Sequence, residues 1–249
     1  MIVALFKRRW WLIQNRLFST IGFSLMFPIL LYVMIFMVLN TIIRESGNHV
    51  PYGEWVFPGF VVLSGSFVIM PILFRDFFDL RIHGRVLLNL TLSPSSKTGL
   101  VTGLILTSLA ESILFSVVAV GVLLTLLQTS FGLMDYLIMI AFSCVFNFVL
   151  ANSIVTLSLL INRTSLFMLS ILALFILITF GSGLLFELGF YPDSVGQILK
   201  FIPTSVIVQC FHSILFLHHI DWLLLFGPII VAGFWTLLNG FILKRTLNQ

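Results

Sequence analysis

The chain has 249 residues and a mean hydropathy of +1.16, with 59% apolar residues and only 9% charged residues. Soluble domains carry about 25% charged residues, so this composition excludes a soluble enzyme, a disordered regulator and a nucleic-acid-binding protein. The net charge is +4, and the positions of the basic residues must explain it. The composition predicts an all-α integral membrane protein.

The N-terminal segment, residues 1–18, has the pattern of a basic amphipathic helix lying on a membrane surface. Apolar residues recur at steps of three and four, including Phe6 and Trp10, and polar residues lie on the opposite side. Two interpretations remain open, a membrane anchor and a platform that also contacts a cytosolic partner. The candidate residues of this interfacial helix are Phe6, Arg8, Arg9 and Trp10.

Six charge-poor apolar stretches are long enough to cross a bilayer, which takes about 20 residues. They cover residues 21–43, 55–74, 101–127, 136–161, 166–186 and 222–243. The stretch 201–217 is interrupted by Pro203 and by polar side chains, and it is too short and too polar for a span. We therefore predict six transmembrane helices in a single domain, residues 1–249.

The distribution of basic residues predicts that both termini are cytoplasmic, because cytoplasmic loops are rich in Lys and Arg. Of the thirteen basic residues, only Arg44 and Lys200 fall on the outer side in this topology. The other eleven are Lys7, Arg8, Arg9, Arg16, Arg75, Arg81, Arg85, Lys97, Arg163, Lys244 and Arg245. The basic excess is therefore a sign of topology and requires no nucleic acid.

The longest predicted cytoplasmic loop, residues 75–100, contains an apolar patch that ends at Ser93-Pro94. An exposed apolar patch indicates a docking site for another protein, or else a segment that packs on the bilayer surface. Ser93 has the properties of a helix N-cap and Pro94 those of a first-turn residue. The candidate docking residues are Arg85, Leu88, Leu92, Ser93, Pro94 and Lys97.

The predicted outer segment, residues 187–221, is rich in Gly and Pro before the apolar run 201–217. Irregular backbone at membrane depth is tolerated where it is buried in protein or lines a wet cavity. We therefore expect a re-entrant outer lid or vestibule with Gly189, Pro192 and Pro203 at its gate, and an ordinary interfacial hairpin is the alternative.

Motifs for catalysis, metals or cofactors are not found in the sequence. Ser96-Lys97-Thr98 lacks the upstream glycines of a phosphate-binding loop, and we expect neither cofactor nor metal. Glu111 is the one acid well inside a predicted span, and intramembrane charges are costly and often functional. We expect it to have no opposite charge at matching depth and to be satisfied by Ser108 and Ser112 of the same helix. A structural or gating role is favoured over an ion site.

Several of these segments together resemble the permease subunit of the type-2 ABC transporter family, which exports drugs, polysaccharides and lipo-oligosaccharides. The resemblance covers nearly the whole chain. Its motifs are Phe57-Pro58-Gly59 at the second span, 90–96 (LTLSPSS) in the inner loop, 181–192 (GSGLLFELGFYP), and 201–204 (FIPT). The run 209–212 departs from the family pattern, which usually continues toward an Arg.

The resemblance implies a non-catalytic permease in a bacterial inner membrane, working as an exporter. It implies two permease copies, identical or related, and a separate ABC ATPase subunit that binds a coupling helix at about 85–97 and the N-terminal helix. The outer segment corresponds to the family's re-entrant helices. The expected partners are thus the ATPase, a second permease and membrane lipid. An ion-coupled secondary transporter or channel that uses Glu111 is the alternative.

Overall fold

The computed structural model describes residues 2–43, 50–82 and 96–247, and all regular structure in these ranges is helical. Six helical stretches are long and apolar enough to cross a membrane, as the sequence predicts. They are α2 with η1 and α3 (Leu17–Leu31, Tyr32–Phe36, Met37–Leu39), α4 with η2 and α5 (Tyr52–Leu73, Phe74–Asp79, Leu80–Ile82), α7 (Lys97–Leu126), α8 (Leu133–Leu160), α9 (Thr164–Gly181) and α12 (Trp222–Leu247). The all-helical structure is confirmed, and its six apolar helices fit a multi-pass membrane protein.

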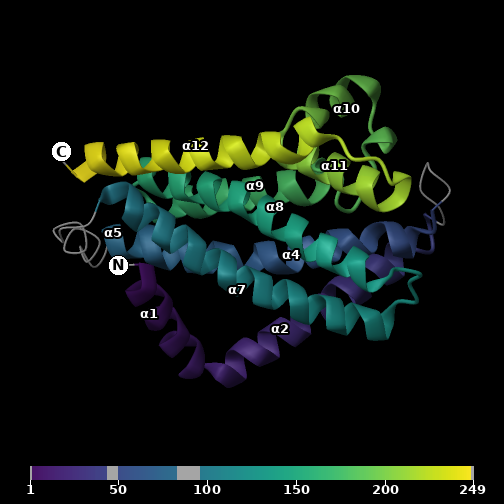
Figure 1. Ribbon diagram of the computed structural model, residues 1–249, viewed down its shortest axis with the longest axis horizontal. Helices are drawn as coiled ribbons and strands as arrows, with labels where there is room; N and C mark the ends of the chain where they lie inside the picture. The colour runs from purple at the N-terminus through teal and green to yellow at the C-terminus, as the bar shows by residue number, and fades with distance from the viewer. Residues whose placement is uncertain (1, 44–49, 83–95, 248–249) are drawn as a thin grey trace.

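The long helices run side by side, and both chain ends lie at the same end of the bundle (Figure 1). We call this the terminal end and the opposite one the distal end. The short helix α1 (Ile2–Gln14) lies at an angle to α2 beside the bundle, and α10 (Asp193–Lys200) and α11 (Pro203–Leu217) lie toward the distal end.

Helix α4 is the centre of the bundle. Of its most apolar 18-residue window, 83% is buried, whereas the corresponding values are 17% for the first span and 22% for α9. Phe57 and Phe60 are fully buried within it. A helix that is apolar on all sides belongs in the interior of a membrane bundle or of a large core, and the less buried helices have apolar faces directed outward.

A buried hydrogen-bond cluster around Asn147 joins α4, α7 and α8. Ser66 Oγ of α4 donates to Asn147 Oδ1 at 2.7 Å, and Asn147 Nδ2 donates to Ser112 Oγ of α7 at 2.8 Å. Asn147 Nδ2 also lies 3.2 Å from Ser143 Oγ. Polar side chains commonly link helices inside membranes, and this cluster connects the three most buried spans.

A second polar cluster fixes α12 against α8. Asn239 Nδ2 donates to Asn152 Oδ1 at 3.1 Å, and Thr236 Oγ1 donates to the same oxygen at 3.0 Å. Thr156 Oγ1 donates to Asn239 Oδ1 at 2.7 Å. Both clusters contain Asn side chains of the fourth span and make bonds between helices.

The N-terminal amphipathic segment is one helix only as far as Gln14. Leu17 and Phe18 already belong to α2, because the chain turns at Asn15 and Arg16. The amphipathic helix expected over 1–18 is therefore shorter than predicted. Within the segment expected as a cytoplasmic loop, 75–100, the helix of the second span continues to Ile82, and α7 begins at Lys97 with Ser96 as its N-cap.

Gly59 allows an irregular segment to approach α4. A methyl group at this position would overlap the backbone carbonyl oxygen of Leu184, which a side-chain rotation cannot relieve. Gly121, on the outward face of α7, has no atom within 4 Å of such a methyl group.

We expect Gly59→Ala to lower the free energy of unfolding by about 2 kcal/mol, because overpacking against backbone forces α4 and the segment at Leu184 apart. Thermal melting in detergent measures the loss. The matched control, Gly121→Ala, should leave stability unchanged or raise it by up to about 1 kcal/mol through helix propensity. Equal melting temperatures for the two variants would contradict this packing.

Candidate functional site

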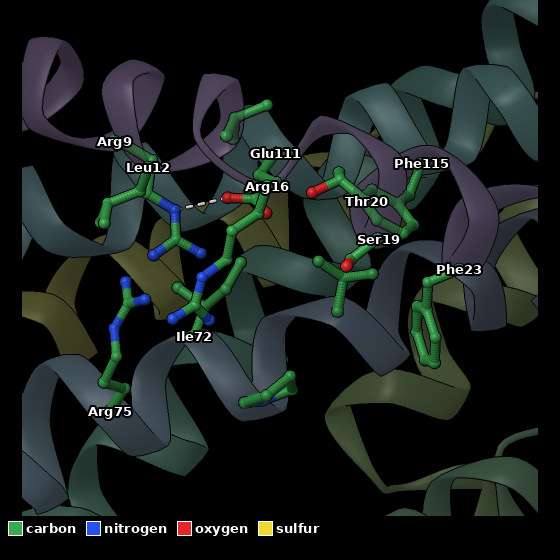
Figure 2. Close-up of a pocket in the computed structure, with 13 residues that line it drawn as sticks. Arg9, Leu12, Arg16, Ser19, Thr20, Phe23, Ile72, Arg75, Glu111 and Phe115 are labelled. Carbon is green, nitrogen blue, oxygen red and sulfur yellow. Dashed lines mark hydrogen bonds and ion pairs between the residues drawn. The ribbon is translucent and has the colours of Figure 1, made fainter.

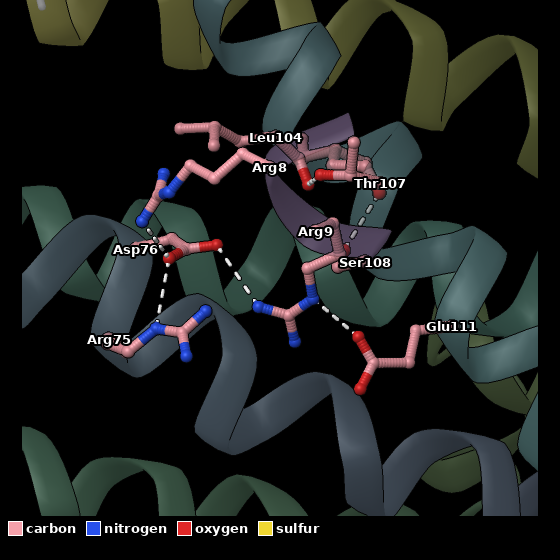
Figure 3. A network of polar contacts seen from close by, with 9 residues as sticks. Arg8, Arg9, Arg75, Asp76, Leu104, Thr107, Ser108 and Glu111 are labelled. Atoms are coloured by element: carbon pink, nitrogen blue, oxygen red, sulfur yellow. Dashed lines mark hydrogen bonds and ion pairs between the residues drawn. The ribbon is translucent and has the colours of Figure 1, made fainter. Parts of the chain in front are cut away.

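A buried ionic network joins α1 to α4 and α7 at the terminal end (Figure 3). Asp76, in the π-helical turns of η2, is 3% exposed and accepts from Arg8 Nη2 at 3.3 Å and from Arg75 Nε at 3.2 Å. Arg9 Nη1 lies 3.6 Å from Asp76 Oδ2, and Arg9 Nε donates to Glu111 Oε2. Arg9 therefore bridges carboxylates on two different helices.

The network fixes the position of α1 rather than adding much stability. Removing two carboxylates and an arginine from water is costly, and their attraction only offsets that cost when the geometry is good. Breaking one member, however, leaves the other charges buried without compensation. The ionic contacts therefore specify one arrangement of α1 on the bundle, in which Leu5 and Arg9 are its buried residues.

The expectation that Glu111 lacks an opposite charge is wrong, because Arg9 pairs with it. Ser108 Oγ donates instead to the carbonyl oxygen of Ile105, and Ser112 accepts from Asn147. The partner lies outside every predicted span and reaches Glu111 because α1 folds back on the bundle. The sequence does hold a signal for this contact. Arg9 lies on the same helical face as the apolar residues Leu5 and Leu12, which indicates that it faces the bundle with them.

The four candidate residues of the N-terminal helix divide into two pairs. Arg8 and Arg9 enter the ionic network, whereas Phe6 and Trp10 are exposed. Phe6 and Trp10, two residues of the predicted apolar stripe, are therefore open on the surface of the chain.

The predicted outer segment forms two helices bent by 91° relative to each other, α10 and α11. Gly189 lies in the short η3 turn (Leu188–Phe190), Pro192 directly precedes α10, and Pro203 is the first residue of α11. Pro192 and Pro203 thus mark the start and the joint of this bent pair, and Gly189 lies in the turn before it.

A cavity of about 320 Å³ lies between the bent pair and α4. Trp55 and His212 line it and lie edge to face, with ring centroids 4.9 Å apart. Glu187, Lys200 and Gln209 also line it, so charged and aromatic groups share one distal hollow. The buried His212 Nε2 has no hydrogen-bond partner among the described residues.

The irregular segment 182–187 passes inside the bundle beneath this cavity. Leu184 and Leu185 are fully buried, and Tyr52 of α4 donates from its hydroxyl to the carbonyl oxygen of Leu185 at 3.3 Å. Ser205 Oγ of α11 donates to the carbonyl oxygen of Gly181 at 3.1 Å. Side chains from two helices therefore supply bonds that the last turn of α9 and the non-helical backbone after it need away from water.

Most of the candidate docking residues lie outside the described residues, namely Arg85, Leu88, Leu92, Ser93 and Pro94. Lys97 begins α7 and lines a cavity of about 370 Å³ with Lys244 of α12 at the terminal end. At this end Arg81 Nη1 also donates to the carbonyl oxygen of Leu159 at 2.7 Å, which ties the end of α4 with α5 to the end of α8.

The described residues hold no group of three His, Cys, Asp or Glu side chains that could bind a metal ion. The features that the geometry does provide are cavities with charged residues in their lining at the two ends and a charged attachment of α1. Searches for matching family models, curated proteins and solved structures give no match.

A double-mutant cycle tests the attachment of α1. We expect Arg9→Met and Glu111→Met each to lower the free energy of unfolding by about 3 kcal/mol, since each leaves a buried charge without its partner. The double variant should lose much less than the sum of the two, as measured by melting in detergent. Additive losses would show that Arg9 and Glu111 do not interact.

Proposed function

We propose that the chain is the permease subunit of an ATP-driven exporter of the type-2 ABC class. It would work with a second permease copy and a separate ATPase subunit, in a bacterial inner membrane with both termini cytoplasmic. The transported compound would pass between the two copies, and the bent pair would form a re-entrant lid on the outer side.

One contact carries this proposal: Gly59 meets the backbone of Leu184. These residues belong to two separate motifs of the resemblance, 57–59 at the start of the second span and 181–192 before the last one. Their meeting beneath the bent helices supports a distal structure built from both motifs, as an exit lid between the fifth and sixth spans requires.

The attachment of α1 is a second support. A separate ATPase must transmit force to the spans through elements at the terminal end. Helix α1 is suited to this because Arg9 connects it to Asp76 and Glu111 at once. A push on α1 would move the inner parts of α4 and α7 together, whereas a helix held only by apolar contact with lipid would slide.

We place the second copy on the side where α2 and α9 flank α4. Phe67 of α4 stacks on Phe27 of α2 with centroids 4.4 Å apart and lies edge-on to Phe175 of α9 at 5.5 Å. The first span and α9 are the least buried of the six spans. A second copy would cover their apolar faces and enclose a path next to Phe67.

Co-purification tests the proposal. We expect an affinity-tagged chain to retain the soluble P-loop ATPase encoded beside it, and Leu88→Asp or Leu92→Asp to release that ATPase without loss of membrane insertion. Leu133→Asp, the same change at an exposed position at the distal end of α8, is the matched control and should keep the ATPase bound.

An ATPase that stays bound to both loop variants would contradict the docking assignment. If the wild-type chain retained no ATPase at all, the exporter proposal would fail.

The second candidate function, an ion-coupled transporter or channel, is favoured by one observation, the position of Glu111 on the wall of a cavity beside α1. Its pairing with Arg9 favours a structural role instead. The measurement uses proteoliposomes with an internal pH-sensitive dye. We expect Glu111→Gln to leave the proton flux the same as that of the wild-type chain. A gradient-driven flux abolished by Glu111→Gln and present without any ATPase would establish the alternative.

A further inference from the structure

A cavity of about 350 Å³ lies in the angle between α1 and α2, against α4 and α7 (Figure 2). Three arginines line one part of it, Arg9 of α1, Arg16 at the turn between the helices, and Arg75 of η2. Figure 2 shows the three guanidinium groups gathered on the same side of the cavity.

The charges at this end of the cavity do not balance within the described chain. Four arginines, Arg8, Arg9, Arg16 and Arg75, lie with two carboxylates, Asp76 and Glu111, which leaves two positive charges over. Like charges gathered at one place repel each other. An anion with access to the cavity would remove that repulsion.

Hydrogen-bond donors are also left over at the same place. Arg75 Nη2 is buried and has no hydrogen-bond partner among the described residues, and Arg9 Nη1 makes no hydrogen bond there but only the 3.6 Å ion pair with Asp76. The exposed Arg16 makes no side-chain hydrogen bond or ion pair with any residue that the structure describes. Buried donors without acceptors are costly. Guanidinium groups bind phosphate oxygens in bidentate geometry, so these donors suit a phosphate group.

The other part of the cavity is apolar. Phe23 of α2 and Phe115 of α7 line it, with ring centroids 6.5 Å apart, and so does Val68 of α4. Ser19 and Thr20 lie between the arginines and the aromatic rings. Because Phe23 and its neighbour Met26 are exposed, the apolar part continues onto the outward face of α2.

We propose that this cavity binds an anionic phospholipid from the leaflet on the side of the chain termini. Its phosphate would accept from Arg9, Arg16 and Arg75, and an acyl chain would lie along Phe23. The turn from a surface helix into a span is at headgroup depth, and the change from charged to aromatic lining fits a lipid better than a free anion. The inference stands independently of the proposed exporter function.

Native mass spectrometry of the full chain in mild detergent tests the site, with phosphatidylglycerol, phosphatidylcholine and inorganic phosphate as probes. We expect phosphatidylglycerol to bind more tightly than phosphatidylcholine and to resist competition by inorganic phosphate. Arg16→Gln should weaken phosphatidylglycerol binding by about tenfold, because a charge-assisted hydrogen bond is lost. Arg16→Lys should lose less, since it keeps the charge.

Arg163→Gln is the matched control, because it removes a positive charge from an exposed residue at the same end, before α9. It should leave binding unchanged. A loss as large as that of Arg16→Gln would show a diffuse surface attraction, and displacement by equimolar inorganic phosphate would show a free-anion site; either result overturns the proposal. The melting temperature without added lipid verifies that both Arg16 variants are folded, as expected for a side chain without internal bonds.

Discussion

The arrangement of the spans depends on the hydrogen bonds that Asn147 makes to Ser66 and Ser112. Inside a bilayer, apolar side chains gain little by facing another helix instead of lipid, so hydrophobicity alone cannot select which helix lies in the centre. Polar side chains do select it, because an unpaired amide in hydrocarbon is costly. Gly65 leaves the necessary room, since a methyl group there would lie 2.5 Å from Ser116 Oγ. The central position of α4 follows from this cluster.

The same argument applies at the terminal end with full charges. Arg9 has one stable position, between Asp76 and Glu111, and it therefore determines where α1 lies. The proposed lipid site shares Arg9 and Arg75 with this network. A phosphate bound there would compensate the positive charges that the two carboxylates do not neutralise. The lipid would then hold α1 in place from the membrane side, while the carboxylates hold it from the bundle side. An ATPase that acts on α1 would then act on a helix with little freedom to slide.

The sequence predicts the six spans closely because charge is absent from long stretches, and that signal is local. It fails where two distant segments meet. Nothing in the local pattern connects Arg9 with Glu111, or Gly59 with Leu184, since each contact depends on how the chain folds back. Even the amphipathic stripe of α1 is misleading for packing, because Trp10 is exposed while Arg9 is buried. The roles of the distal bent pair and of the inner loop remain predictions.

A transport cycle needs parts that stay rigid and parts that can change their angle. The Asn147 cluster and the Asn152 cluster make α4, α7, α8 and α12 one connected unit. The turn at Arg16 is different, because the first span is only 17% buried and α1 is tied to the bundle at few points, the ionic network and Leu5. Movement would therefore concentrate in the angle between α1 and α2, where the arginine-lined cavity lies. In the proposed exporter, the occupant of that cavity would set how far α1 can swing, and the membrane's own lipid would become part of the coupling between ATPase and spans.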